Sequence, residues 1–257
     1  MPDTLPLPLT VVIPTFNEAW QIAEAVDALR WADEVIVADG GSTDDTVLIA
    51  REHGARVIEV RGQTIAGQRN AAIAAARNEW VLALDADERV GDDLRHELAH
   101  VLAAPTRSAY RVRCRNIYLG RERQRGRWGR DWHVRLFQRT QRFLDERVHE
   151  RLAPVPSPGP GTLRAPIQHL PYRDLTHQLQ KMVTYARWGA QDLYARGRRA
   201  TVLDLTARPV WRFLRDYVLY GSFLDGRVGL VGSALTAYAG FLKYVYLWDL
   251  SEHPTAA

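Results

Sequence analysis

The stretch WVLALDADE, Trp80 to Glu88, joins an apolar run to a group of carboxylates and indicates the fold. Trp80 to Leu84 has the length and composition of a buried strand. Carboxylates directly after such a strand lie at its carboxyl end, where open α/β sheets bind their ligands. Carboxylates on alternate residues, Asp85 and Asp87, can also bind a hard divalent cation. The stretch therefore predicts a parallel sheet with a ligand site at its edge.

Three more strand patterns precede this stretch, and a helical pattern follows each of them. The strands are expected at residues 10–13, 35–38 and 56–60, and the helices at 20–30, 43–52 and 65–76. This alternation is typical of a parallel sheet flanked by helices, so the predicted fold class is α/β. Every predicted strand ends in polar or turn residues. We therefore expect Thr15, Asn17, Asp39 and Asp85 to lie along one edge of the sheet.

The pattern changes after Arg107. Alternating residues at 110–115 and 133–137 predict short strands with one basic face, the segment 154–166 is rich in proline, and the chain from Asp174 onward has a helical pattern. We therefore predict a domain at residues 1–153, with a ligand-binding half at 8–100 and a second side at 101–153. A linker at 154–173 and a helical extension at 174–257 complete the predicted organisation.

The composition is that of a folded protein with an uneven distribution of charge. The chain has 257 residues, of which 46% are hydrophobic and 25% charged, so it can bury a core without disulfides, and Cys114 is its one cysteine. Residues 107–151 hold 14 arginines and five acids. Because arginine binds phosphate through paired hydrogen bonds, a nucleotide, a phosphorylated glycan, an anionic lipid or a nucleic acid fits this segment. Residues 1–9 lack the pattern of a signal peptide, so secretion is not expected.

The last helices are unusually apolar. Residues 229–248 contain one charged residue, Lys243, and at about 1.5 Å of rise per residue they are just long enough to cross a hydrocarbon core of ~30 Å. Lys243 and the aromatic residues of this segment favour a helix that lies on a membrane surface. A packed core or dimer helix and a true membrane span are the alternatives.

Three motifs in order carry a resemblance to a known family. They are Pro14-Thr15-Phe16-Asn17-Glu18 after the first strand, Ala38-Asp39-Gly40-Gly41-Ser42-Thr43-Asp44 after the second, and Asp85-Ala86-Asp87. Over residues 8–100 the sequence resembles the inverting family-two glycosyltransferases of the GT-A fold. The resemblance implies a Rossmann-like nucleotide-sugar domain, a small β region for the acceptor and a C-terminal helical extension. An isolated Asp-x-Asp pair would more often cap a helix, so the evidence is the order of all three motifs.

The resemblance also implies roles for individual residues. Asn17 and Glu18 fall in the loop that lines the nucleobase and ribose, and Asp39 on the position that pairs with the base. Asp87 falls on the ligand of a divalent cation, Mg²⁺ or Mn²⁺, with Asp85 beside it, and such a cation neutralises the departing diphosphate. The full set expected to bind the nucleotide sugar is Pro14, Thr15, Asn17, Glu18, Asp39, Gly41, Ser42, Gln68, Arg69 and Asp85, of which Gln68 and Arg69 approach the diphosphate and Asp85 the ribose.

A second set of motifs concerns the rest of the chain. These motifs are similar to the subgroup that includes lipopolysaccharide core β-1,4-glucosyltransferases: Trp132 to Phe137, Val148-His149-Glu150, Pro209 to Phe213, Gly221 to Gly226 and Phe241 to Tyr244. The similarity implies transfer of a hexose, with glucose expected, from a uridine diphosphate sugar to a lipid-linked glycan. It also implies a peripheral protein at the cytoplasmic face of the inner membrane.

An inverting transfer needs a base that takes the proton of the acceptor hydroxyl. Glu150 lies where the subgroup carries its equivalent acid and is the first candidate, Asp131 is the second and Glu88 the third. For Glu150 the alternative is an ion pair with a neighbouring arginine. His149 is a candidate for orienting the acceptor or the diphosphate.

Two other functions remain open from the sequence. A nucleotidyltransferase also combines an α/β nucleotide domain with a metal and paired carboxylates, but it would carry a Gly-rich basic loop where Pro14 to Glu18 stands. A module that binds nucleic acid or an anionic surface would use the arginines at 107–151 and would not need Asp39 or Asp87. We expect no nucleic-acid partner. The sequence lacks the nucleophile elbow of a hydrolase and the glycine fingerprint of a dinucleotide-binding domain.

Overall fold

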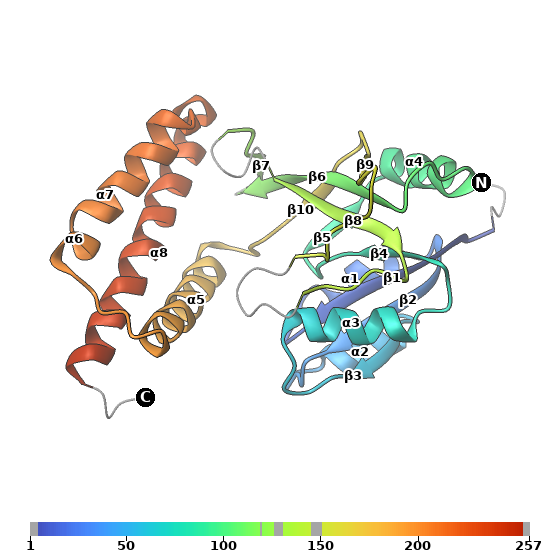
Figure 1. Cartoon of the computed structure of the whole chain (residues 1–257), viewed down its shortest axis with the longest axis horizontal. Helices are drawn as coiled ribbons and strands as arrows, with labels where there is room; N and C mark the ends of the chain where they lie inside the picture. Colours follow the sequence, from blue (N-terminus) through green and yellow to red (C-terminus); the bar gives the residue numbers. More distant parts are fainter. Residues whose placement is uncertain (1–4, 119, 126–130, 145–150, 254–257) are drawn as a thin grey trace. The chain divides into compact units, whose positions relative to one another are not determined.

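The computed structural model describes residues 5–118, 120–125, 131–144 and 151–253 (Figure 1). The contacts between residues divide the chain into two compact units. Unit 1 comprises Met1–Cys114 and Trp132–His169, and unit 2 comprises Arg115–Asp131 and Leu170–Ala257. The chain therefore passes from one unit to the other at three points.

Unit 1 is built on a mixed sheet whose first half is parallel. The strands β1 (Leu7–Thr15), β2 (Ala32–Asp39), β3 (Arg56–Glu59) and β4 (Trp80–Ala83) lie in the order β3-β2-β1-β4 and run parallel. The sheet continues with β8 (Trp132–Gln138), β6 (Ala109–Tyr118), β10 (Ile167–His169) and β5 (Glu88–Val90), and β8 is antiparallel to β4. Two short strands pair with β6: β9 (Gly161–Thr162) in unit 1, and β7 (Arg121–Glu122), which pairs with the end of β6 that belongs to unit 2. The carboxyl ends of β1, β2 and β4 therefore meet at one edge.

Helices cover both faces of this sheet, because alternate residues of its strands are apolar on both sides. Leu9, Val11 and Ile13 of β1 belong to one core, which includes residues of α1 (Ile22–Asp27), α2 (Thr46–Glu52) and α4 (Asp92–Ala103). Val12 belongs to a second core, on the opposite face, with residues of α3 (Ile65–Ala75). Burial on both faces is expected of a parallel sheet. The predicted α/β class and its four parallel strands are confirmed.

The segment predicted as a linker, 154–173, is strand in part. Prolines dominate its start, where they remove the N–H groups that pairing needs. Beyond them, β9 pairs with β6 and β10 pairs with β5, and Leu163 and Ile167 are buried in the core of unit 1. Unit 1 therefore extends to His169. The predicted acceptor side, 101–153, is also divided, because Arg115–Asp131 belongs to unit 2.

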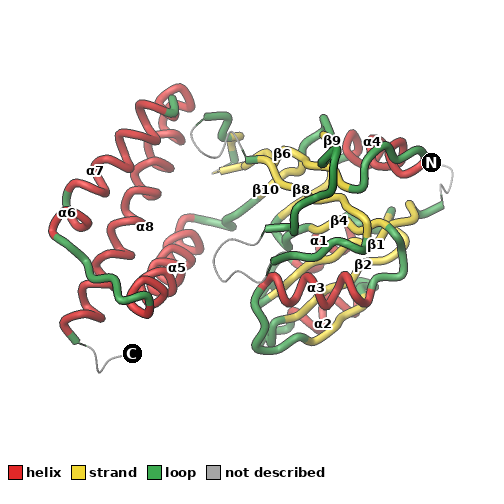
Figure 2. The backbone as a smooth tube through the Cα atoms, viewed as in Figure 1, coloured by secondary structure: helices red, strands yellow, loops and turns green. Residues whose placement is uncertain are grey.

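Unit 2 is helical, as predicted for the chain from Asp174 onward (Figure 2). Its helices are α5 (Leu175–Ala195), α6 (Val202–Leu205), α7 (Ala207–Leu214) and α8 (Gly226–Glu252), with a π-helical turn at Arg215–Leu219 and a 3-10 turn at Ser222–Asp225. In a small core between α5 and α8, Ala190 lies with Tyr244 and Leu247. Among the described residues, one helical stretch, Ser222–Glu252, is long and apolar enough to cross a membrane, and 33% of its most apolar window is buried inside the protein.

A buried arginine ties the segment 115–131 to the helices of unit 2. The Nη2 atom of Arg123 donates to Ser222 Oγ at 3.0 Å and lies 3.6 Å from Asp216 Oδ2. Gly232 of α8 makes room for it, since a Cβ there would lie 2.4 Å from Nη1 of Arg123. Removing the C-terminal helices would therefore strip a buried cation of its partners, which is strongly destabilising.

Candidate active site

The loop after β2 is held by the buried carboxylate of Asp39. Its Oδ2 accepts hydrogen bonds from the backbone N–H groups of Gly41 and Ser42, each at 2.9 Å, and its Oδ1 accepts from Ser42 Oγ at 2.5 Å. Gly41 has a φ of 103°, a conformation that favours glycine. Asp39 therefore fixes the loop, and its contact with a nucleobase stays a prediction.

Hydrogen bonds join the loop after β1 to the loop after β2. The backbone N–H of Asn17 donates to Ser42 Oγ at 2.8 Å, and Asn17 Oδ1 accepts from the N–H of Thr43 at 2.8 Å. Asn17 has a φ of 58°, which asparagine adopts more readily than most residues. The N–H of Glu18 donates to Thr46 Oγ1 at 2.8 Å. The two predicted loops thus form one connected surface.

The first turn of α3 lies against this surface. Thr64 caps the helix by accepting a hydrogen bond from the N–H of Gly67 at 3.1 Å. Gln68 is buried beside Gly40, because a Cβ on Gly40 would lie 2.6 Å from Nε2 of Gln68. The glycine thereby admits Gln68 to the edge where the loops after β1 and β2 meet.

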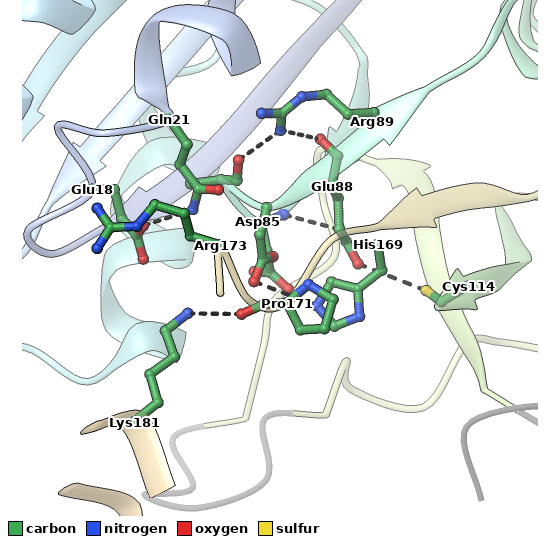
Figure 3. A network of polar contacts seen from close by, with 12 residues as sticks. Glu18, Gln21, Asp85, Glu88, Arg89, Cys114, His169, Pro171, Arg173 and Lys181 are labelled. Carbon is green, nitrogen blue, oxygen red and sulfur yellow. Dashed lines mark hydrogen bonds and ion pairs between the residues drawn. The ribbon is translucent and has the colours of Figure 1, made fainter. Parts of the chain in front are cut away.

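Carboxylates and arginines form a cluster directly after β4. Asp85 accepts hydrogen bonds from Nη2 of Arg69, in α3, and from Nη2 of Arg135, in β8, the second at 3.1 Å. The same Arg135 atom lies 2.5 Å from Oε1 of Glu88, and Oε2 of Glu88 accepts from the N–H of Asp85 at 2.9 Å. Figure 3 shows Asp85 and Glu88 together with Cys114, whose Sγ lies 3.7 Å from Glu88 Oε1.

The charges in this cluster change the acidity of its members. Burial opposes ionisation of Asp85, but the guanidinium groups of Arg69 and Arg135 outweigh it and hold the pKa of Asp85 well below its ordinary value. Glu88 is more buried, and burial raises its pKa despite the charge of Arg135. Burial would lower the pKa of Arg135, but Glu88 and Asp85 raise it well above its ordinary value. Asp85 is therefore an ionised carboxylate and Arg135 a permanent cation.

Strand β10 brings a histidine to Asp87, the second carboxylate of the Asp85-Ala86-Asp87 motif. His169 is the register partner of Glu88 across β10 and β5, and its Nε2 lies 3.4 Å from Asp87 Oδ2. Burial would lower the pKa of His169, but the hydrogen bond and charge of Asp87 raise it. A carboxylate oxygen and an imidazole nitrogen are donors that a divalent transition-metal ion accepts. Asp87 and His169 fit such an ion better than Asp85, each of whose oxygens already accepts from an arginine.

Direct contacts join most of the residues predicted to bind the donor. Thr15 and Asp39 are register partners, and the backbone oxygen of Thr15 accepts from the N–H of Gly40 at 2.9 Å. Further contacts join Asp39 to Gly41 and Ser42, Asn17 to Ser42, and Arg69 to Asp85. These contacts join the first two motifs to each other, and α3 places Gln68 beside Gly40 and Arg69 on Asp85 of the third motif. Binding of a nucleotide sugar by these residues stays a prediction.

The three predicted bases lie in different surroundings. Glu150 and its neighbour His149 lie outside the described residues. Asp131 belongs to unit 2 and is half-buried. Glu88 is buried against Arg135, an arrangement that suits a structural carboxylate better than a base that must meet an acceptor hydroxyl.

The sequence interpretation missed two residues of the site, Arg135 and His169. Arg135 stands in an apolar run, Val134 to Phe137, and an arginine in a buried strand must have a partner. That was an available signal. His169 lies within the segment 154–173 that the sequence predicts as a linker, and the local pattern gives no signal of a strand that would bring it beside Asp87.

Comparisons with known proteins give the family. The sequence model described as Glycosyl transferase family 2 matches residues 10–154. An uncharacterized glycosyltransferase of Rickettsia prowazekii (strain Madrid E) is 29% identical over 95% of this chain and 87% of its own length. The lipopolysaccharide core biosynthesis glycosyltransferase LpsC of Rhizobium meliloti (strain 1021) is 26% identical over 95% of this chain and 93% of its own length.

Among solved structures, glucosyl-3-phosphoglycerate synthase from Mycobacterium tuberculosis matches 42% of this chain and 43% of its own, with 27% identity and a TM-score of 0.37. The family match spans the loops after β1 and β2 and the carboxylate cluster after β4. This chain therefore belongs to glycosyl transferase family 2, and its α/β sheet with helices on both faces has the GT-A fold.

Proposed function

We propose that this protein is an inverting hexosyltransferase that requires a divalent cation. It transfers a hexose, with glucose as the first choice, from a uridine diphosphate sugar to a lipid-linked glycan such as lipopolysaccharide core. The observation that carries the proposal is the pair Asp87 and His169 beside the charged cluster of Asp85. The relative named for lipopolysaccharide core biosynthesis, which aligns over 95% of this chain, supports the choice of acceptor.

Asp87 and His169 are the residues that would hold the cation. When bound, the cation supplies positive charge to the departing nucleotide diphosphate. Arg69 and Arg135 hold the Asp85 carboxylate in one orientation from two sides, and we assign this carboxylate to the ribose of the donor. The connected loops after β1 and β2, through Asn17 and Asp39, are assigned to the nucleobase.

The base is assigned to Glu150, with Asp131 as the second candidate. Inversion requires the acceptor oxygen to attack the anomeric carbon on the face opposite the departing diphosphate, while a carboxylate takes its proton. The assignment of Glu150 follows the resemblance to the core glucosyltransferase subgroup. Glu88 is the weakest of the three candidates, because Arg135 occupies its carboxylate.

The orientation of α7 supports attachment to a membrane surface. Both of its arginines contact α8: Arg208, whose side chain is 46% exposed, donates to the Tyr244 hydroxyl, and the half-buried Arg212 packs against Gly240. Its apolar residues Val210, Trp211 and Leu214 are 59%, 54% and 44% exposed. An amphipathic helix that exposes apolar side chains together with arginine is suited to the boundary between headgroups and acyl chains. We place the protein at the cytoplasmic face of the inner membrane, where the lipid-linked acceptor would be.

Family membership favours glycosyl transfer over the two alternatives that the sequence left open. A nucleotidyltransferase would need a Gly-rich phosphate loop after β1, and the loop Pro14 to Glu18 contains no glycine. A module that binds anions without catalysis gives no reason for the pairing of Asp87 with His169.

A donor screen tests the proposed reaction. The full-length protein is incubated with each nucleotide sugar, a truncated lipopolysaccharide acceptor and Mg²⁺ or Mn²⁺, and release of nucleotide diphosphate is recorded. Release from UDP-glucose that depends on both cation and acceptor is the expected result. If nucleotide diphosphate were released from a different nucleotide sugar and not from UDP-glucose, that sugar would replace glucose in the proposal. Release of nucleotide diphosphate without any added cation would contradict the metal assignment.

Point variants test membrane attachment better than truncation does, because truncation removes the partners of the buried Arg123. Trp211→Ser and Val210→Ser should sediment less with vesicles than the wild-type protein, while both keep its melting temperature. A dimer in solution that is disrupted by the same substitutions, with no binding to vesicles, would assign these residues to an oligomer interface.

A further inference from the structure

A cluster of cations lies in unit 2, outside the site described above. We define this cation cluster by Arg198 after α5, Asp204 in α6, Arg208 and Arg212 in α7, and Lys243 in α8. Four of these side chains are basic and one is acidic, so the cluster has an excess of positive charge. The roles assigned above to binding of the donor, the metal and the acceptor hydroxyl use none of them.

Direct contacts hold the cation cluster together. Nε of Arg208 lies 3.0 Å from Oδ1 of Asp204, and Nη2 of Arg198 lies 3.6 Å from the same oxygen. The ring of Tyr244 lies 5.0 Å from the guanidinium carbon of Arg208 and 5.1 Å from Nζ of Lys243. An aromatic face attracts cations, so the ring of Tyr244 stabilises both charges.

Two glycines admit the other cationic side chains to the helix surfaces. A Cβ on Gly240 would lie 2.6 Å from Nη1 of Arg212, and a Cβ on Gly189 of α5 would lie 3.0 Å from Cδ of Lys243. A larger residue at either position would displace the neighbouring cation. The sequence of α5 and α8 therefore leaves room for positive charge at positions where the charges repel one another.

The crowding has an electrostatic consequence at Lys243. Burial lowers the pKa of Lys243, and Arg212, Arg208 and Arg198 lower it further, while Asp204 opposes them. Like charges held this close destabilise the unit unless a negative group offsets them. The guanidinium groups of the cation cluster are suited to phosphate oxygens, which they bind through paired hydrogen bonds.

Helices α6 and α7, which contribute Asp204, Arg208 and Arg212 to the cluster, also expose apolar side chains. On α7 these are the residues Val210, Trp211 and Leu214 described above, and on α6 they are Val202 and Leu203, which are 76% and 70% exposed. A free phosphate ion would contact only the cations. A phospholipid offers a phosphate for the cations and acyl chains for the apolar residues of α6 and α7.

We propose that the cation cluster binds the phosphate group of an anionic membrane lipid, whose acyl chains contact the exposed apolar residues of α6 and α7. The proposal rests on the membrane attachment proposed above and adds a specific contact to it. Lys243, Arg208 and Arg212 surround the phosphate, and Asp204 fixes Arg208 in position.

The test compares Lys243→Met with Lys181→Met, the same substitution at the other lysine of the chain. Each full-length protein is sedimented with vesicles of phosphatidylcholine alone and with vesicles that also contain phosphatidylglycerol. Wild type and Lys181→Met should bind the anionic vesicles equally, and Lys243→Met should bind them about fivefold more weakly, the effect of one basic group near a membrane surface. Without lipid, Lys243→Met should melt at or above the wild-type temperature, because it removes a repelled charge.

The remaining outcomes separate the headgroup site from the attachment itself. Equal weakening by both substitutions would show general attraction to negative charge and overturn the site. Inorganic phosphate at matched ionic strength could protect wild type but not Lys243→Met from thermal unfolding, while the two proteins bind vesicles equally. In that case the ligand would be free phosphate, and the assignment to a lipid would be wrong. Wild-type protein that stays in the supernatant with anionic vesicles would overturn both the headgroup site and the membrane attachment. The donor screen tests the proposed reaction separately.

Discussion

The Nη2 atom of Arg135 lies 2.5 Å from Oε1 of Glu88, and both side chains are buried. Arg135 belongs to β8 and Glu88 begins β5, so this pair joins two strands of the antiparallel half of the sheet to the loop after β4. The same nitrogen reaches Asp85, so one cation offsets two carboxylates. Arg135 is therefore expected to matter for stability and for the shape of the donor site.

Arg135→Met should lower the free energy of unfolding by about 3–5 kcal/mol, as expected when one partner of a buried ion pair is removed. The substitution leaves Asp85 and Glu88 without the cation between them. Urea unfolding followed by circular dichroism measures the change. Arg135→Lys keeps the charge and should recover most of the loss, whereas a Met variant as stable as wild type would show that the pair contributes nothing.

His169→Ala should weaken binding of the cation more than it weakens the fold. His169 lies at the end of β10 beside Asp87, and its removal takes away one of the two donors that we assign to the cation. Loss of one metal ligand should raise the Mn²⁺ concentration needed for half-maximal activity by at least about tenfold. His177→Ala, at the start of α5, is the matched control. An unchanged Mn²⁺ requirement in His169→Ala would remove the histidine from the site.

Glu150→Gln and Asp131→Asn separate the two candidate bases. An amide has nearly the shape of the carboxylate but cannot take the acceptor proton, so the variant of the true base should lose about 100-fold to 10,000-fold in turnover while it still binds donor. We expect this result for Glu150→Gln. Turnover by single-turnover kinetics and donor affinity by calorimetry are measured together. If turnover collapsed in Asp131→Asn and stayed near the wild-type value in Glu150→Gln, Asp131 would be the base and Glu150 would not.

Asp44 should make the stability of unit 1 dependent on acid pH. Its Oδ1 accepts from the N–H of Thr46 at 3.1 Å and its Oδ2 from the N–H of Ala19 at 3.2 Å. Burial opposes ionisation, but the hydrogen bonds from Thr46 and Ala19 outweigh it and lower the pKa of Asp44 below its ordinary value of 3.8. A lowered pKa stabilises the fold above the unfolded-state pKa, and this contribution is lost as pH falls through the folded-state pKa.

Asp44→Asn should therefore melt below the wild type at pH 6, and the difference should shrink as the pH falls below 4. The loss in the free energy of unfolding at pH 6 should be about 1 kcal/mol or less, since the side chain of Asp44 is exposed. Asp45→Asn is the control, because among the described residues the Asp45 side chain makes no capping hydrogen bond to α2. A difference that grew toward low pH would contradict the sign of the effect.

The parallel half of the sheet could be predicted because its signals are local. Each of the four strands is an apolar run that ends in polar or turn residues, and the order of the motifs after them fixes which loops meet. The contacts between Asn17 and Ser42 and between Arg69 and Asp85 agree with that prediction.

In the antiparallel half, β6 and β8 agree with the strands predicted at 110–115 and 133–137. Their place in the sheet could not be predicted, because it depends on pairing between distant segments. Arg135 reaches Glu88 across 47 residues of sequence, and β10 pairs with β5 from within the segment 154–173 that the sequence predicts as a linker. The direction of α7 was also undetermined, since an amphipathic pattern is the same whether Trp211 faces the protein or the solvent. The contacts of Arg208 with Tyr244 and of Arg212 with Gly240 decide it.

The most direct measurement of the central claim is release of UDP from UDP-glucose in the presence of acceptor, by wild type and by Asp87→Ala, over a range of Mn²⁺ concentrations. Wild-type activity should rise with Mn²⁺ and disappear when a chelator is added. Activity of Asp87→Ala should fall about a thousandfold, because a cation stabilises the departing diphosphate by several kcal/mol, while the melting temperature changes little. Full activity of Asp87→Ala, or wild-type activity that persists with the chelator, would contradict the account.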